Sequence, residues 1–162
     1  GNDATQIQVS FAPVEGATIS SSYIKKENQN VIKRQYEAGG IAGKYSFGPV
    51  SAGYAHFEIQ PALEGAQSAI YTDHYVNDAY GISLNVNDAL SVSFTHEKSE
   101  ANKETVVDAE VDTTVEAEIT AIQAAYTMGG MTLSLASKEL ENMDYTTGKD
   151  GKETTFAVVM AF

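Results

Sequence analysis

The sequence predicts an all-β protein whose antiparallel strands run up and down in chain order. Two observations support this prediction. Apolar and polar residues alternate with period two along nine segments, which is typical of strands with one apolar and one polar face. Between these segments, short turns alternate strictly with long polar connections, as expected for antiparallel neighbours. We therefore expect residues 1–162 to form a single β region without a second domain.

The composition excludes several classes of protein. The hydrophobic fraction of 43% over 162 residues is ordinary for one folded domain. The absence of cysteine excludes disulfides and thiolate metal sites, and the net charge of −12 argues against nucleic acid as a partner. No run of about 18 apolar residues occurs, which excludes a transmembrane helix. A spanning strand needs only roughly 9–11 residues, half of them apolar, so spanning by strands stays open.

The first half of the chain contains four predicted strands, which are 5–11, 17–24, 35–47 and 50–59. Segment 50–59 is ambiguous, because Tyr54 and Phe57 have opposite parity although both are aromatic. A β-bulge in this segment would reconcile them.

The second half contains five predicted strands, which are 79–86, 90–96, 119–128, 131–137 and 154–162. A three-residue turn at 87–89 keeps Leu84 and Val92 on one face, whereas a two-residue turn would turn the second strand over. Gly129 and Gly130 form a typical two-residue hairpin turn.

The connections sort by length. Four are tight, at 12–16, 48–49, 87–89 and 129–130, and four are long and polar, at about 25–34, 60–72, 97–114 and 138–153. All tight turns therefore lie at one end of the strands and all long loops at the other, as in outer-membrane barrels. We expect an antiparallel up-and-down transmembrane β-barrel.

A membrane barrel turns its apolar face to lipid and its polar face to the lumen. Aromatic residues near the tight turns (Phe11, Tyr45, Phe47, Tyr126) suit an interfacial girdle, and the acidic residues of 97–112 lie in a predicted loop. The residues expected to face lipid or a neighbouring subunit are Leu84, Val92, Phe94, Tyr126, Leu133, Val158 and Phe162. The residues expected to line the pore are Ser20, Ser22, Lys44, Ser83, Asn85, Ser91, Ser93, Thr132 and Ser134.

The end of the chain carries a resemblance to a known family. The strand 154–162, which ends on Phe162, resembles the C-terminal strand by which the barrel-assembly machinery recognises Gram-negative outer-membrane proteins. The hairpin 124–133 resembles the penultimate hairpin of trimeric porins, most closely the alphaproteobacterial type. The resemblance implies a homotrimer of 16-stranded, water-filled channels in the cell outer membrane. Such channels pass ions and small hydrophilic solutes, have no cofactor and are not enzymes.

Three architectures follow from these observations. Nine antiparallel strands cannot close into an antiparallel barrel, but they can be the last nine of sixteen, which makes the chain the C-terminal half of a porin. The alternative is a small eight-stranded barrel that begins near Ala17 and has a structural or adhesion role. A third possibility is a soluble ligand-binding barrel with its apolar face turned inward.

No catalytic or metal-binding motif is evident. His56, His74 and His96 fall on three strands without ligand spacing, and no nucleophile elbow or EF-hand spacing occurs. A basic cluster of Lys25, Lys26, Lys33 and Arg34 surrounds the first long loop, either as an anion-attracting mouth or as a solvated loop. The acidic excess favours passage of cations.

Overall fold

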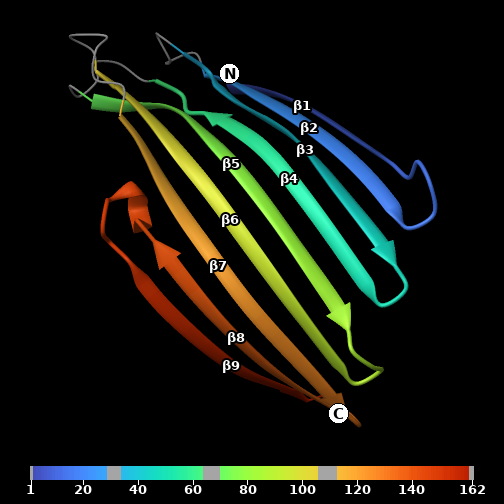
Figure 1. Ribbon diagram of the computed structural model, residues 1–162. Helices are drawn as coiled ribbons and strands as arrows, with labels where there is room; N and C mark the ends of the chain where they lie inside the picture. Colours follow the sequence, from blue (N-terminus) through green and yellow to red (C-terminus); the bar gives the residue numbers. More distant parts are fainter. Residues whose placement is uncertain (1, 29–33, 64–69, 106–112, 161–162) are drawn as a thin grey trace.

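The computed structural model describes residues 2–28, 34–63, 70–105 and 113–160, which form one antiparallel sheet (Figure 1). Its strands are β1 (Asn2–Phe11), β2 (Ala17–Asn28), β3 (Tyr36–Phe47), β4 (Val50–Gln60), β5 (Ile70–Asn85), β6 (Leu90–Thr105), β7 (Thr113–Met128), β8 (Met131–Glu141) and β9 (Gly151–Met160), with a short 3₁₀ turn η1 (Met143–Tyr145) between β8 and β9. Each strand pairs with its neighbours in chain order. The predicted all-β, up-and-down order of nine strands is confirmed.

The sheet is open. Among the described residues, β1 and β9 are both edge strands, and Figure 1 shows them on opposite sides of a twisted wall. No helix in the described part of the chain is long and apolar enough to cross a membrane.

The central strands are much longer than predicted. Ile70–Asn85, Leu90–Thr105 and Thr113–Met128 extend well beyond the predicted 79–86, 90–96 and 119–128. The predicted loop at 97–114 was therefore wrong over most of its length. Apolar alternation stops there, but the backbone pairing of β6 with β5 and β7 continues, because pairing requires no apolar side chain.

The bulge predicted in 50–59 is also wrong. β4 pairs with β3 and β5 without a shift of register, so Tyr54 and Phe57 lie on opposite faces. The register shift lies instead in β5, between Thr72 and His74.

The tight turns lie where the sequence predicts them, at one end of the sheet, which we call the turn end; the opposite end is the loop end. In the turn after β5, the side-chain oxygen of Asn87 accepts hydrogen bonds from the backbone N–H groups of Ala89 and Leu90, both at 2.9 Å. Gly129 has a φ of 60°, a left-handed conformation that favours glycine in a two-residue hairpin.

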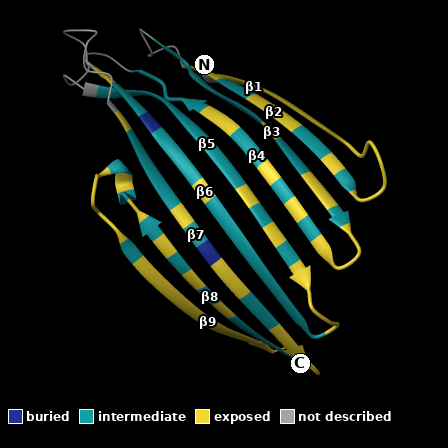
Figure 2. Ribbon diagram, viewed as in Figure 1, coloured by how far each residue is buried: buried dark blue, intermediate teal, exposed yellow. Residues whose placement is uncertain are grey.

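The sheet has almost no buried core. Ala101 and Ala121 are the buried hydrophobic residues among those described, and every strand is otherwise half-exposed or exposed (Figure 2). Almost all side chains of the sheet are therefore accessible on one of its two faces.

Candidate functional site

The strand register divides the side chains between two faces, because directly opposed residues of antiparallel neighbours point the same way. We call face A the face crossed by the row Phe47, Val50, Leu84, Val92, Ala124, Leu135 and Phe156. Face B is crossed by the adjacent row Ser46, Ser51, Ser83, Ser93, Gln123, Ala136 and Thr155. The two rows lie one residue apart along each strand. The row on face A is apolar, and the row on face B is almost entirely polar.

Face A is apolar over the half of the sheet next to the turn end. This apolar band follows β5 from Tyr80 to Leu84, ends at Val86 in the turn, and crosses the sheet from β3 to β9 in the Leu84 row. Toward β9 the Tyr80 row becomes polar, with His96, Thr120, Glu139 and Lys152. The side chains of the band are highly exposed: 73% for Phe47, 65% for Phe156 and 62% for Ile122. The aromatic residues predicted near the tight turns, which are Phe11, Tyr45, Phe47 and Tyr126, all lie on face A and are exposed.

The residues predicted to face lipid or another subunit share this face. Leu84, Tyr126 and Val158 are exposed, at 38%, 44% and 43%, and Val92, Phe94 and Leu133 are half-exposed. Phe162, for which we also expect a role in assembly, lies outside the described residues.

The residues predicted to line the pore all lie on face B. They are Ser20, Ser22, Lys44, Ser83, Asn85, Ser91, Ser93, Thr132 and Ser134. Apart from Lys44 and Asn85 they have short side chains. Their rows contain hydroxyl contacts between strands, such as Ser46 to Ser51 at 2.8 Å and Thr127 to Thr132 at 3.0 Å. The structure thus brings both predicted groups together, each on one face.

Face A becomes charged toward the loop end, where the sequence predicts loops and not strands. Two charged rows cross it, His56–Asp78–Lys98–Glu118 and Glu58–Val76–Glu100–Glu116. The Lys98 ammonium lies 2.7 Å from the Glu100 carboxylate and 3.0 Å from that of Glu116. Charged residues at every second position, as in Glu116 and Glu118, are the sequence signal that would have identified these strands.

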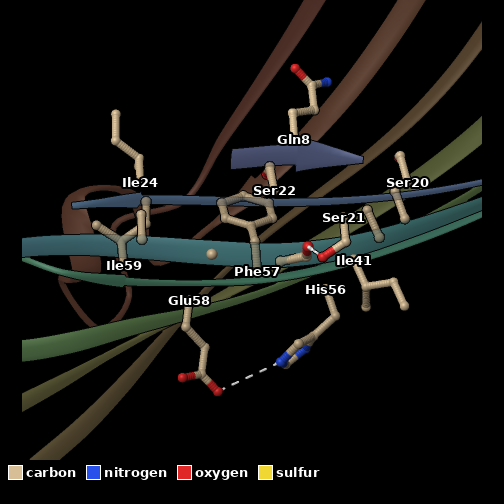
Figure 3. Close-up of a pocket in the computed structure, with 15 residues that line it drawn as sticks. Gln8, Ser20, Ser21, Ser22, Ile24, Ile41, His56, Phe57, Glu58 and Ile59 are labelled. Carbon is tan, nitrogen blue, oxygen red and sulfur yellow. Dashed lines mark hydrogen bonds and ion pairs between the residues drawn. The ribbon is translucent and has the colours of Figure 1, made fainter. Parts of the chain in front are cut away.

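Face B changes in the opposite sense and becomes apolar toward the loop end. Ile24, Phe57, Ile59, Tyr75, Ile119 and Leu140 lie there. Figure 3 shows part of this surface, a hollow of about 280 Å³ over β1 to β4. In that view Gln8 and Ile24 extend to one side of the sheet, and His56 and Glu58 extend to the other.

Charge is also segregated between the faces. The charged strand residues of face B, among those described, are Lys26, Lys44, Lys103, Lys138, Glu97 and Glu153. The acidic residues of the charged rows lie on face A. The acidic excess that favoured cations therefore does not line face B of this wall.

The described members of the predicted basic cluster have separate partners. Lys25, on face A, pairs with Glu37 at 3.2 Å, whereas the Lys26 ammonium, on face B, lies 5.1 Å from the centroid of the Tyr36 ring. Lys33 lies outside the described residues. The remaining member, Arg34, binds elsewhere.

Arg34, just before β3, binds the loop end of β5. Its guanidinium donates to the carboxylate of Asp73, to the Asp73 carbonyl at 2.6 Å and to the Pro61 carbonyl at 3.2 Å. Partial burial raises the pKa of the Asp73 carboxyl, but the hydrogen bonds from His74 and Arg34 outweigh it and hold that pKa below its usual value. Asp73 lies beyond the charged rows, far from the apolar band.

The histidines have separate partners. His56 bonds to Asp78 at 3.0 Å, His74 to Asp73 at 2.8 Å and His96 to Thr120 at 2.9 Å. No group of three or more histidine or acidic residues that could hold a metal occurs in the part of the chain that the structure describes.

No family model, curated protein or solved structure matches this chain.

Proposed function

We propose that this chain is part of the wall of an outer-membrane porin, a trimeric, water-filled β-barrel through which small hydrophilic solutes and ions diffuse passively. The observation that supports this proposal most strongly is the opposite polarity of the two faces at the turn end. Exposed apolar side chains cover face A, and short polar side chains cover face B, over the same rows of the sheet. Face A would meet lipid or a neighbouring subunit, and face B would line the lumen.

The exposure of the apolar band favours lipid over water as its surroundings. Burial of one large apolar side chain contributes about 1.5–3 kcal/mol, and contiguous exposed patches of this extent mark interaction or membrane surfaces. Phe47, Ile122 and Phe156 are each more than half exposed, at 73%, 62% and 65%. Lipid or a neighbouring subunit would cover such side chains.

The dimensions of the band bear on its position in the membrane. From Tyr80 to Val86 it extends about 20 Å along the strand direction. With the strand tilt of about 35–45° in outer-membrane barrels this spans about 15 Å of membrane, less than their apolar band of about 25 Å. Tyr54 and Tyr80, both 50% exposed, lie on face A at the margin of the band nearest the loop end. The charged rows follow directly beyond them. We propose that the tyrosines mark the membrane interface, where tyrosine is enriched, and that the charged rows lie on its loop-end side.

The open edges favour a larger barrel. Since β1 and β9 run in the same direction, antiparallel closure needs an odd number of further strands, and seven would make sixteen. β1 pairs with β2 along its whole length, from Asn2–Asn28 to Phe11–Ile19. This pairing supports the sixteen-stranded barrel over the eight-stranded alternative that begins near Ala17, since β1 is an integral strand of the sheet.

Single-channel recording from the full protein in planar lipid bilayers tests the proposal. We expect stepwise conductance that grows in proportion to salt concentration, because the route is a hydrated pore. Protein that inserts into the bilayer without conducting would support the small structural barrel instead. Protein that remains soluble and folded without detergent would support the soluble barrel, and either result would overturn the porin proposal.

A further inference from the structure

The edge of the apolar band that faces the loop end runs obliquely across face A. Each strand has one residue at this edge, the last large apolar side chain of the band before the polar residues of face A begin. We call the line through these nine residues the boundary line. From β1 to β9 it passes through Ile7, Tyr23, Ile41, Tyr54, Tyr80, Phe94, Ile122, Leu135 and Phe156.

The strand pairing gives the course of the boundary line. Counted in residues from the Leu84 row toward the loop end, the line lies at eight on β1 and β2, six on β3, four on β4 and β5, two on β6 and β7, and zero on β8 and β9. It never rises from one strand to the next. From β1 to β9 it therefore descends toward the turn end by one residue per strand on average.

The charges of face A follow this line and not the rows. Val9 on β1 and Ile41 on β3 are 55% and 54% exposed, yet their row continues through charged residues to Glu118 on β7. Among the described strand residues, no charged side chain of face A lies on the turn-end side of the line. Val76 and Tyr71 are the large apolar or aromatic side chains beyond it on these strands, and the Tyr71 hydroxyl bonds to Glu104 at 2.7 Å.

Tilted strands account for the slope. A residue advances about 3.3 Å along a strand and neighbouring strands lie about 4.8 Å apart, so a descent of one residue per strand is an angle of about 35°. Strands of outer-membrane barrels tilt by about 35–45° from the membrane normal, and the rows across them are inclined to the membrane plane by the same angle. A flat bilayer surface must therefore cross the rows obliquely, whereas a protein partner has no reason to follow one slope across nine strands.

We propose that the boundary line marks the loop-end surface of the lipid hydrocarbon on face A, and that the wall beyond it stands outside the bilayer. This inference rests on the proposed outer-membrane function and adds which part of face A the lipid covers. Val9 lies inside the bilayer, although Glu118 in the same row lies outside it.

Face B supports the same line. Its large aliphatic and phenylalanine residues toward the loop end each adjoin, along the strand, a charged residue of face A beyond the line; they are Ile24, Phe57, Ile59, Ile119 and Leu140. The wall there has one charged and one apolar face, with the charged face outward, which is the polarity of a β protein in water. Between the line and the turn end the apolar face is outward, which is the polarity of a barrel in lipid.

The depth of single fluorescent labels tests the oblique line. The sequence has no cysteine, so Val9→Cys, Glu118→Cys and Ala124→Cys each introduce one labelling site in the full protein. Val9 and Glu118 share a row, whereas Ala124 lies six residues from Glu118 along β7. The line descends by six residues from β1 to β7, or about 16 Å along the membrane normal. Val9 is therefore level with Ala124.

In lipid vesicles, we expect lipids brominated in mid-chain to quench the labels at Val9 and Ala124 about twofold or more and to leave the label at Glu118 nearly unchanged. Iodide in the water should quench the label at Glu118 alone. Lys98→Cys, in the same row on β6, replaces Glu118→Cys if that variant does not fold.

The outcomes separate the oblique line from the porin function. Equal quenching of the Val9 and Glu118 labels by brominated lipids in inserted protein would show that the membrane surface follows the rows, which overturns the line and leaves the porin function standing. Iodide access to all three labels in inserted protein would place face A in water and overturn both. Protein that does not insert into the vesicles would overturn the porin function itself.

Discussion

Lys44 lies on face B between Thr18 of β2 and Gly53 of β4, and it forms no ion pair with any described residue. A unit charge about 4 Å from an ion in water changes its energy by about 1 kcal/mol, less at high salt. We therefore expect Lys44→Glu to shift the permeability ratio several-fold toward cations at low salt, measured as a reversal potential. The matched control is Lys152→Glu on face A, which should leave the ratio unchanged. An equal shift in both variants would contradict the assignment of the faces.

Asp73 offers a test by pH at the same scale. Because the pKa of its carboxyl is lowered in the folded protein, its contribution to stability is present above the unfolded pKa and is lost as pH falls through the folded one. At neutral pH we expect Asp73→Asn to unfold at lower urea concentration, with a loss of about 1–2 kcal/mol. Below the folded pKa the variant and the wild type should converge. A difference that persisted undiminished in acid would show that the charge on Asp73 is not responsible.

At the scale of elements, β3 and β4 approach closely at Gly40. A Cβ there would lie 2.5 Å from both the His56 carbonyl oxygen and the Phe57 Cβ, whereas a Cβ on Gly43 of the same strand would meet nothing within 4 Å. We expect Gly40→Ala to lower the free energy of unfolding by about 1–3 kcal/mol. Gly43→Ala, the matched control, should change it by less than about 1 kcal/mol. Urea titrations of the two refolded variants provide the comparison, and equal stability would contradict the close packing of this strand pair.

Strand order and tight turns could be predicted from the sequence because both depend on local rules. Asn87 acts through its side chain on the next residues of its turn, Gly129 acts through its own backbone conformation, and parity propagates along each strand. Strand length could not be predicted so well. Residues 97–105 look like a polar loop because their side chains carry no apolar alternation, yet neighbouring strands supply the pairing that keeps them extended. That information lies in the partner strands.

At the scale of the whole molecule, the polarity of both faces inverts about halfway along the strands. The alternation in the sequence predicts one polarity for each face, which matches the rows near Leu84 and Ser83 but is wrong toward the loop end. Phe57 is the aromatic residue whose parity does not fit the predicted apolar face. It lies on face B because that face is apolar toward the loop end, and not because of a bulge in β4. The placement of residues 142–150 over face B depends on contacts between residues as distant as Tyr75 and Tyr145, which no local pattern contains.

Two adjacent residues of β5 test the orientation of the whole wall. Ile82 is 52% exposed in the middle of the apolar band on face A, and Ser83 lies on face B between Ser51 and Ser93. An arginine at the bilayer midplane of a barrel costs about 2–4 kcal/mol. We expect Ile82→Arg to lose about that much free energy of folding into lipid vesicles, measured by urea titration.

The Ser83→Arg variant introduces the same charge one residue further along the strand. If face B lines a hydrated lumen, its arginine stays solvated, so we expect its folding free energy to remain within about 1 kcal/mol of the wild type. Its long side chain should instead occupy part of the pore and lower the single-channel conductance. A sheet with face A packed inside a soluble barrel would leave Ser83→Arg in bulk water, with no conductance to lower. Equal losses in the two variants would contradict the assignment of lipid and lumen, and a greater loss in Ser83→Arg would reverse it.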